Sequence, residues 1–308
     1  MSDNSSSERG TAVLLLTCPD QKGIVATVAE FVYRHGGNII HAEQHTDAER
    51  GIFFQRVEFE LDGLNLAPDD IEPAFASIAR RYDMQFDLRR SAHRAKLAIF
   101  VSRQALCLYD LLARWRTGEL RGEVVVVVSN HPDLADVAEH FGVDYRHLPV
   151  TPGDKSSQER AAIDVLRAHD VDLVVLARYM QVLSPAFVAA YPHRIINIHH
   201  SFLPAFVGAS PYRQAHERGV KIIGATAHYA TEELDEGPII DQDVTRVSHR
   251  DSVDDLVQKG RDLETIVLAR AVRAHLEAPG ARLRQQDRRV RLNADARPYG
   301  EFAAGCRR

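Results

Sequence analysis

In the first ninety residues, segments with the hydrophobic pattern of a β-strand alternate with segments whose apolar residues have helical spacing. Residues 12–17 (AVLLLT) form a continuous apolar run that predicts a buried strand, and residues 23–35 carry apolar side chains at helical spacing. In chain order, the pattern predicts strand, helix, strand, strand, helix and strand over residues 12–17, 23–35, 38–44, 53–61, 68–80 and 84–88. This βαββαβ order predicts a ferredoxin-like domain.

From residue 97 onward, short β-branched runs alternate with amphipathic segments. The expected strands cover residues 97–101, 124–129, 173–177, 195–198 and the strand-like segment 224–227, and the expected helices cover 107–115, 134–141, 157–169 and a segment starting at 185. Ser156 and Glu159 are a candidate capping box for the third of these helices. The alternation predicts an open, mostly parallel α/β sheet, whose ligands bind beyond the carboxyl ends of the strands.

These patterns divide the chain into five parts. We expect a disordered polar lead-in at residues 1–10, the ferredoxin-like domain at 11–88, a basic linker at 89–96 (RRSAHRAK), the α/β domain at 97–277 and an atypical tail at 278–308. The tail is rich in Arg and Ala and shows neither strand alternation nor a helical stripe. It is interpreted either as disordered or as the product of a reading-frame shift in a high-GC gene.

The composition excludes several classes of protein. Of the 308 residues, 45% are hydrophobic and the formal net charge is −5, which argues against a nucleic-acid-binding protein and its usual basic face. The 3 cysteines lie far apart without a CxxC pair, which argues against a disulfide framework and favours a reducing compartment. Neither a signal peptide nor an apolar run of about 18 residues occurs, so we expect no membrane span and a cytoplasmic location.

The segment from residue 195 to 240 holds the candidate chemistry. Asn197 and His199 lie two apart at a strand end, so both side chains point to one face. Asp235 lies in an acidic loop, TEELDEGP, where Gly237 and the following proline predict a turn. An amide can stabilise an oxyanion while an imidazole and a carboxylate manage protons, which is the chemistry of acyl or formyl transfer without a covalent nucleophile.

The same residues have simpler interpretations. An Asn-x-His pair at a strand end is often structural, and Glu232, Glu233 and Glu236 are the residues expected of a solvated loop face. We expect His200 to pack rather than to react, and Gly208 to allow close approach of the backbone to a ligand.

Three separated motifs carry a resemblance to a known family. The runs NIHHSFLPAF and HY–ELDEGPII, with LARYMQVL upstream, resemble the folate-dependent formyltransferases over residues 97–276, and most closely the formyltetrahydrofolate deformylases. The resemblance implies 10-formyltetrahydrofolate as substrate and Asn197, His199 and Asp235 as catalytic residues. It also implies a folate pocket formed by Arg178, Met180, Val182, Leu183, His228, Glu233 and Gly237.

The first domain resembles a second family. The run LTCPDQKGIVATVAEFVYRHGGNI is similar to an ACT domain, with Asp20, Gly23 and Asn38 where such domains bind small amino-acid effectors. The resemblance implies glycine or methionine as candidate effectors and a homo-oligomer. The alternative is that this domain only builds an oligomer interface.

Water is the expected nucleophile. A ribonucleotide acceptor needs a glycine-rich phosphate loop, and the matching segment here, VSRQALCLYDLL, contains no glycine. We therefore expect hydrolysis to formate and tetrahydrofolate, supplying formate for purine synthesis and balancing one-carbon pools, with no metal or cofactor. In this hypothesis His199 and Asp235 position the water, Asp235 manages its proton, Asn197 and His199 stabilise the oxyanion, and His228 either orients Asp235 or packs.

Two departures and three rival functions remain at this stage. Leu106 stands where deformylases usually have a histidine, and the tail differs from the β-rich ending of the family. The rivals are an amine formyltransferase, a non-catalytic folate or amino-acid sensor, and a metallohydrolase. We expect a metal site to be disfavoured because His199 and His200, adjacent on a strand, would point to opposite faces.

Overall fold

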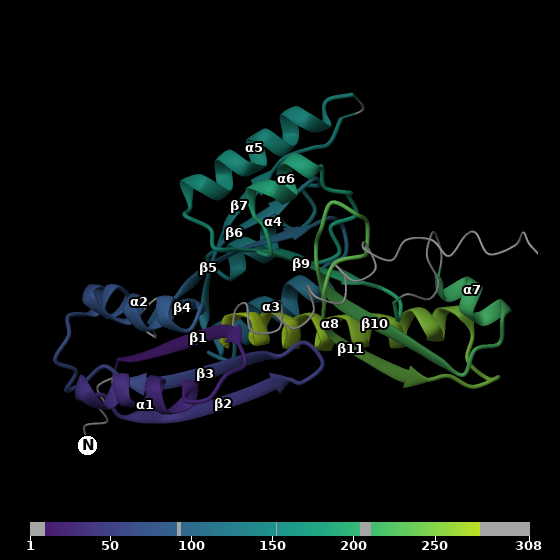
Figure 1. Ribbon diagram of the computed structural model, residues 1–308. Coiled ribbons are helices and arrows are strands. Elements are labelled where there is room, and N and C mark those ends of the chain that lie inside the picture. The colour runs from purple at the N-terminus through teal and green to yellow at the C-terminus, as the bar shows by residue number, and fades with distance from the viewer. Residues whose placement is uncertain (1–9, 91–93, 152, 204–210, 278–308) are drawn as a thin grey trace, which may run out of the picture. The chain divides into compact units, whose positions relative to one another are not determined.

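A computed structural model of the chain describes residues 10–90, 94–151, 153–203 and 211–277. These residues form two units, divided between Arg94 and Ala95 (Figure 1). The expectations for residues 1–9, Gly208 and the tail fall outside the described residues. Among the described helices, none combines the length and apolar character needed to cross a bilayer.

The first unit is a four-stranded antiparallel sheet with two helices. Its elements are β1 (Thr11–Pro19), α1 (Ile24–Arg34), β2 (Ile39–Asp47), β3 (Ile52–Glu60), the 3-10 turn η1 (Pro68–Asp70), α2 (Ile71–Arg81) and β4 (Gln85–Arg90). The strand order is β2-β3-β1-β4, and every pairing is antiparallel. The predicted βαββαβ domain is therefore confirmed.

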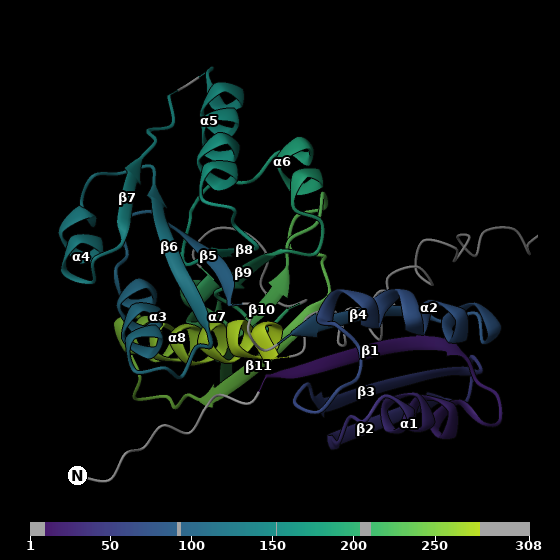
Figure 2. The same ribbon diagram turned by 90° about the vertical axis from the view of Figure 1, so that its left-hand side faces the viewer.

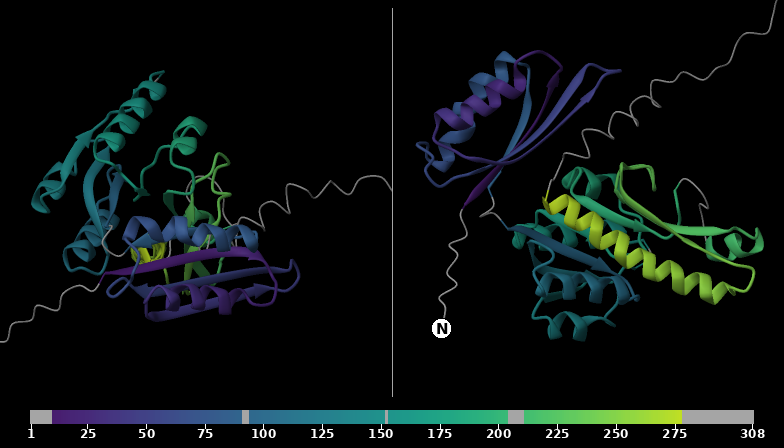
Figure 3. Two further views of the ribbon diagram at one scale, coloured as in Figure 1. Left: turned by 60° about the vertical axis from the view of Figure 1, so that its left-hand side comes forward. Right: turned by 90° about the horizontal axis from the view of Figure 1, so that it is seen from below.

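Both helices of the first unit bury an apolar stripe against the same sheet. Helix α1 buries Val28 and Phe31, and α2 buries Ile71 and Phe75. Phe31 and Phe75 meet edge to face with ring centroids 5.2 Å apart, so the two helices also pack on each other. Figure 3 shows the helices together on one side of the sheet. Among the described residues of this unit, no helix lies over the other face of the sheet.

The second unit is built on a seven-stranded sheet. Its elements are β5 (Ala95–Val101), α3 (Leu106–Arg116), β6 (Gly122–Ser129), α4 (Ala135–His140), β7 (Asp144–His147), α5 (Lys155–Ala168), β8 (Leu173–Leu176), α6 (Pro185–Ala190), β9 (Ile195–His199), α7 (Pro211–Glu217), β10 (Ile222–Tyr229), β11 (Ile239–Arg246) and α8 (Val253–Glu277). The order is β11-β10-β9-β8-β5-β6-β7. Strands β5 to β9 pair in parallel, and β10 and β11 are antiparallel additions, which confirms the mostly parallel α/β sheet.

Helices cover both faces of this sheet (Figure 2). Helices α3, α4 and α8 share one apolar core with the sheet, and α5 and α6 share another on the opposite face. Strand β8 is buried along its whole length, as expected of a strand between two helical layers. The carboxyl ends of β5, β6, β8 and β9 consequently meet at one edge of the sheet.

Several sequence predictions need correction. The linker predicted at 89–96 is wrong at both ends, because β4 continues to Arg90 and β5 begins at Ala95. The capping box is also wrong: α5 begins at Lys155, and the Glu159 carboxylate accepts a hydrogen bond from the Ser184 N–H instead. Four elements were not predicted from the pattern: β7, α7, β11 and α8.

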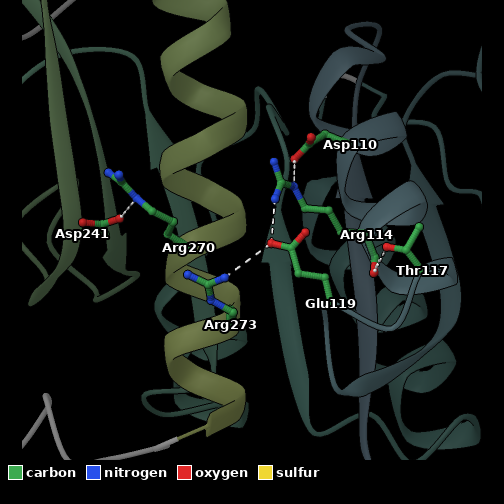
Figure 4. Close-up of polar contacts among 7 residues, drawn as sticks. All are labelled: Asp110, Arg114, Thr117, Glu119, Asp241, Arg270 and Arg273. Carbon is green, nitrogen blue, oxygen red and sulfur yellow. Dashed lines mark hydrogen bonds and ion pairs between the residues drawn. The ribbon is translucent and has the colours of Figure 1, made fainter.

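Helix α8 carries charged side chains toward its neighbours at the surface (Figure 4). Arg114 Nη1 lies 2.6 Å from Glu119 Oε1, and Arg273 Nη1 lies 3.5 Å from the same oxygen. Arg270 Nε lies 2.6 Å from Asp241 Oδ2 on β11. We call this set the α8 surface cluster; it comprises Asp110, Arg114, Glu119, Asp241, Arg270 and Arg273.

Candidate functional site

Two neighbouring strands place the first pair of polar side chains. The antiparallel register of β9 and β10 sets Asn197 opposite His228. The Asn197 Nδ2 atom lies 3.2 Å from His228 Nε2. His228 Nδ1 lies 3.0 Å from the Tyr229 carbonyl oxygen, which can only accept, so Nδ1 carries a hydrogen and donates. Strand pairing alone therefore brings the amide and this imidazole together.

Asp235 reaches both strands from the β10–β11 loop. Its Oδ2 lies 3.2 Å from His199 Nδ1, and its Oδ1 lies 3.4 Å from His228 Nε2. A hydrogen bond from His199, and then the proximity of His228, hold the pKa of the Asp235 carboxyl well below its usual range. Asp235 has a left-handed backbone with φ 59°, a conformation that aspartate tolerates better than most residues. The predicted catalytic residues Asn197, His199 and Asp235 thus lie together; their roles stay predictions.

The loop that presents Asp235 is fixed at its closing end. The Tyr229 N–H donates to the Pro238 carbonyl at 2.9 Å. A Cβ on Gly237 would lie 1.7 Å from the Tyr229 carbonyl oxygen, so only glycine fits there. Gly237 thus has a structural reason to be glycine, and its predicted contact with folate stays a prediction.

His199 offers one unused nitrogen. Because the Asp235 carboxylate only accepts, His199 Nδ1 must donate to it. In the neutral ring, Nε2 then carries the basic lone pair. This Nε2 atom is buried and has no hydrogen-bond partner among the described residues. A buried polar atom of this kind needs a partner, which a substrate or a water can supply.

His200 does not lie where the sequence predicts. Its ring stacks on His199 with centroids 5.1 Å apart and planes at 29°, so the expectation that the two rings point to opposite faces is wrong. The reason is that β9 ends at His199, and strand alternation does not extend to the next residue. Burial, followed by the charges of Arg178 and His199, lowers the pKa of His200 to about 4, so this ring is neutral near pH 7.

The third rival function, a metallohydrolase, requires a cluster of metal ligands. In the part of the chain that the structure describes, no three His, Cys, Asp or Glu side chains are arranged to hold a metal ion. Both oxygens of Asp235 instead face imidazole nitrogens at hydrogen-bonding separations. The metallohydrolase alternative therefore lacks a ligand set among the described residues.

A second polar group lies beside the site, and the sequence analysis identified only its Arg178, as a predicted folate-binding residue, and missed Tyr212 and Glu264. Arg178 Nε lies 3.4 Å from Glu264 Oε2, and the Tyr212 hydroxyl donates to Glu264 Oε1 at 2.9 Å. Glu264 is only 1% exposed. Burial raises the pKa of the Glu264 carboxyl, against the lowering effect of Arg178 and Tyr212. An acid on the apolar stripe of α8 was the available signal, but it could be read only once that helix was recognised. We call Arg178, Tyr212 and Glu264 the Glu264 network.

The residues predicted to bind folate have mixed environments. Met180 and Val182 are 59% and 58% exposed, Leu183 is partly buried, and Glu233 is exposed. Arg178 pairs with Glu264, as described above, and His228 contacts Asp235. The folate-binding roles of these residues stay predictions.

A buried polar pair beside this segment was also missed. The Met180 N–H donates to Ser102 Oγ, whose hydroxyl donates to Asn130 Oδ1 at 2.7 Å. Ser102 and Asn130 directly follow β5 and β6. Polar residues that directly follow buried parallel strands are the signal that would have identified them.

The predicted effector residues lie at turns of the first unit. Gly23 has φ 93° and precedes α1, where its carbonyl accepts the Thr27 N–H at 2.9 Å. Asn38 Nδ2 donates to Glu60 Oε2 at 3.1 Å, and Asp20 is exposed. Effector binding by Asp20, Gly23 and Asn38 stays a prediction.

Two family models match the chain. The formyl transferase model matches residues 95–272, more than half of the chain, and the ACT domain model matches residues 12–67. A formyltetrahydrofolate deformylase of Synechocystis is 57% identical over 267 residues, covering 87% of this chain and 94% of its own length. The chain therefore carries an ACT domain followed by a formyl transferase domain.

The chain matches the solved structure of a deformylase over more of its length than that of a transformylase. The crystal structure of a formyltetrahydrofolate deformylase from Pseudomonas syringae matches with a TM-score of 0.86 and 48% identity, covering 89% of this chain and 92% of that one. A glycinamide ribonucleotide transformylase from Symbiobacterium toebii matches with a TM-score of 0.57 and 36% identity, covering 60% of this chain and 89% of that one. The chain belongs to the formyltetrahydrofolate deformylases of the formyl transferase family.

Proposed function

We propose that this chain hydrolyses 10-formyltetrahydrofolate to formate and tetrahydrofolate. The observation that carries the proposal is His199 Nε2, a buried basic nitrogen without a partner among the described residues. It belongs to a ring whose other nitrogen is held by Asp235 and which lies on the same strand face as Asn197. The names of the relatives reported above support the same reaction.

The first step is attack by water on the formyl carbon. His199 Nε2 takes a proton from the water as the oxygen bonds to the formyl carbon, and the ring becomes an imidazolium. Asp235, already ionised and hydrogen-bonded to Nδ1, stabilises that charge. This assigns the proton to His199 rather than to Asp235, because both carboxylate oxygens face imidazole nitrogens.

The formyl oxygen becomes an oxyanion in the same step. The Asn197 amide has two N–H groups, and only one is directed at His228. The second donates to the oxyanion. A donor of this kind typically contributes about 10²–10³ in rate.

The second step breaks the C–N10 bond. The electron pair of that bond returns to N10, which takes the proton from His199 Nε2 and leaves as tetrahydrofolate. The remaining formic acid loses a proton to solvent as formate. His199 is neutral again, so atoms and charges balance over one turnover and no cofactor or metal is consumed.

Water rather than an amine is supported by the segment after β5. Residues 101–112 contain no glycine, so a glycine-rich phosphate cradle is absent there. Leu106 begins α3 and is 45% exposed, and it has no polar atom to hold a co-substrate. A non-catalytic sensor would have no need of the Asn197, His199 and Asp235 contacts.

The wider role follows from the reaction and the first unit. The formate would feed purine synthesis and the reaction would balance one-carbon pools. An amino acid such as glycine or methionine would bind the ACT domain through Asp20, Gly23 and Asn38, in a cytoplasmic homo-oligomer. The buried free thiols Cys18 and Cys107 support a reducing compartment.

The test is incubation of the purified chain with 10-formyltetrahydrofolate alone. Formate and tetrahydrofolate should accumulate in equal amounts, and addition of glycinamide ribonucleotide should not raise the rate of formyl loss. His199→Gln should abolish release while leaving the fold intact by circular dichroism. Formyl loss that requires an added amine would instead favour the transferase.

A further inference from the structure

A continuous row of side chains connects the catalytic histidine to a buried ion pair. The His200 ring stacks on His199, and its centroid also lies 6.2 Å from that of the tilted Tyr212 ring. Tyr212 donates to Glu264, and Glu264 pairs with Arg178. The proposed mechanism uses none of His200, Tyr212, Arg178 and Glu264.

The local packing shows that this row is built tightly. A Cβ on Gly260 of α8 would lie 2.0 Å from the Tyr212 hydroxyl oxygen, so glycine at this position is what lets Tyr212 reach Glu264. Arg178 has φ 63°, an unfavourable backbone for a long side chain, and its side chain is 12% exposed. A strained backbone conformation persists only where the surrounding contacts hold the residue in place.

Charges of both signs therefore lie near His199. The titratable and charged groups around His199 and the Glu264 network come from every neighbouring element: Cys107 of α3, Arg178 after β8, His200 after β9, Tyr212 of α7, His228 of β10, Asp235 of the β10–β11 loop, and Arg261 and Glu264 of α8. The Cys107 thiol is neutral because burial raises its pKa to about 12. Glu264 is the direct counter-charge of the Arg178 guanidinium.

We propose that Arg178 and Glu264 are positioning residues that balance charge beside His199, with Tyr212 and the neutral His200 ring holding the pair in place. The inference rests on the proposed function, because it gives the His199 ring a reason to be tuned. The mechanism needs His199 neutral to accept a proton and positively charged afterwards. An unpaired Arg178 would disfavour the charged ring, and an unpaired Glu264 would favour it.

If this arrangement is right, removing Glu264 and removing Arg178 should shift the titration midpoint of His199 in opposite directions. Glu264→Gln leaves Arg178 unopposed and should lower the titration midpoint of His199 by about half to one pH unit. Arg178→Met should raise the midpoint by a similar amount at pH values where Glu264 stays ionised, because the carboxylate is then unopposed. Tyr212→Phe removes a donor that screens the Glu264 carboxylate and should also raise the midpoint, by a smaller amount. The double variant Arg178→Met/Glu264→Gln should return close to wild type.

The experiment is an NMR titration of the full chain labelled with 15N-histidine. The His199 signals are assigned from their loss in the His199→Gln variant. Arg273→Met and Glu119→Gln are matched controls, because they break an ion pair on the outside of α8 and should leave the His199 midpoint unchanged. The readout needs no substrate, so a failure of the proposed reaction and a failure of this inference are separate results.

Shifts of the same sign in the two charge variants, or no shift in either, would overturn the inference. Tyr212→Phe keeps the ring and its packing, so it tests the same prediction if an unpaired buried charge prevents a single variant from folding. A midpoint that falls or does not move in that variant also counts against it. In kinetic terms, the acid limb of the kcat/KM profile for formate release should move with the midpoint.

Discussion

Two sets of ion pairs touch helix α8, and they differ in burial rather than in distance. In the α8 surface cluster, Arg270 and Asp241 are 2.6 Å apart with side chains 38% and 23% exposed. Figure 4 shows this surface set. In the Glu264 network, the Arg178–Glu264 separation is longer, 3.4 Å, with side chains 12% and 1% exposed. A count of short contacts would rank the surface set first.

The free-energy cost of removing one partner should nevertheless be larger in the buried Glu264 network than in the surface cluster. Water screens exposed pairs and hydrates either partner when the other is removed, so they contribute about 0–1 kcal/mol each. A buried charge has no such replacement, and removal of its partner leaves it uncompensated. The functional residues therefore lie where each polar group depends on its neighbours, and the following changes test that dependence.

Asp235→Asn should have the largest effect. The amide cannot supply the negative charge that stabilises the His199 imidazolium, so we expect kcat to fall by about 10²–10⁴-fold. Formate release under single-turnover conditions is the measurement. Glu236→Gln is the matched control in the same loop, where the side chain is exposed, and its kcat should stay near wild type. Equal losses in the two variants would show that the loop, not the Asp235 carboxylate, matters.

Glu264→Gln should destabilise the second unit by about 3–5 kcal/mol, because Arg178 would remain buried and charged without its partner. Urea unfolding followed by circular dichroism gives the free energy of unfolding. The neutral double variant Arg178→Met/Glu264→Gln should recover most of the loss. If the double variant is as unstable as the single one, packing rather than charge explains the effect.

Sequence reasoning worked best where one local pattern determined the outcome. The apolar run of β1 and the helical stripe of α1 are both local, and both elements form with bounds within two residues of those predicted. The motif resemblance likewise indicated Asn197, His199 and Asp235, whose contacts follow from strand register and one loop. The family and fold therefore followed from the chain alone.

What the sequence missed depends on contacts between distant segments. Glu264 and Arg178 are 86 residues apart, and nothing local in either segment indicates the pairing. The Ser156–Glu159 capping box failed because the Glu159 carboxylate accepts from Ser184, 25 residues away. The orientation of His200 was mispredicted because it depends on the residue at which β9 ends.

His200 gives a pH-dependent prediction of intermediate size. Its pKa in the folded chain is about 4, below the ordinary value of 6.5, so the unfolded chain binds a proton that the folded chain excludes. The free energy of unfolding should therefore fall as pH decreases from about 6.5 toward 4, by roughly 3 kcal/mol in total. Urea unfolding at several pH values checks this. His200→Asn lacks the titrating ring and should show a shallower decline; an unchanged slope would contradict the assignment.

Gly260→Ala should have a smaller effect. The new Cβ would lie 2.0 Å from the Tyr212 hydroxyl oxygen, so Tyr212 must move away from Glu264. Overpacking of this kind costs about 1–3 kcal/mol, which thermal unfolding would detect. In a Tyr212→Ala background the same substitution should cost almost nothing. A cost that persists there would mean that the methyl group clashes with something other than Tyr212.

Arg273→Met should have the smallest effect, although it removes a visible ion pair with Glu119. Both side chains are substantially exposed, at 42% and 37%, and Glu119 keeps Arg114 as a partner 2.6 Å away. The free energy of unfolding should change by less than about 0.5 kcal/mol, and less still at high salt. A loss as large as that of Glu264→Gln would mean that the surface of α8 is as tightly coupled as its buried side. The contrast between the two sets of ion pairs would then have to rest on geometry rather than on solvent.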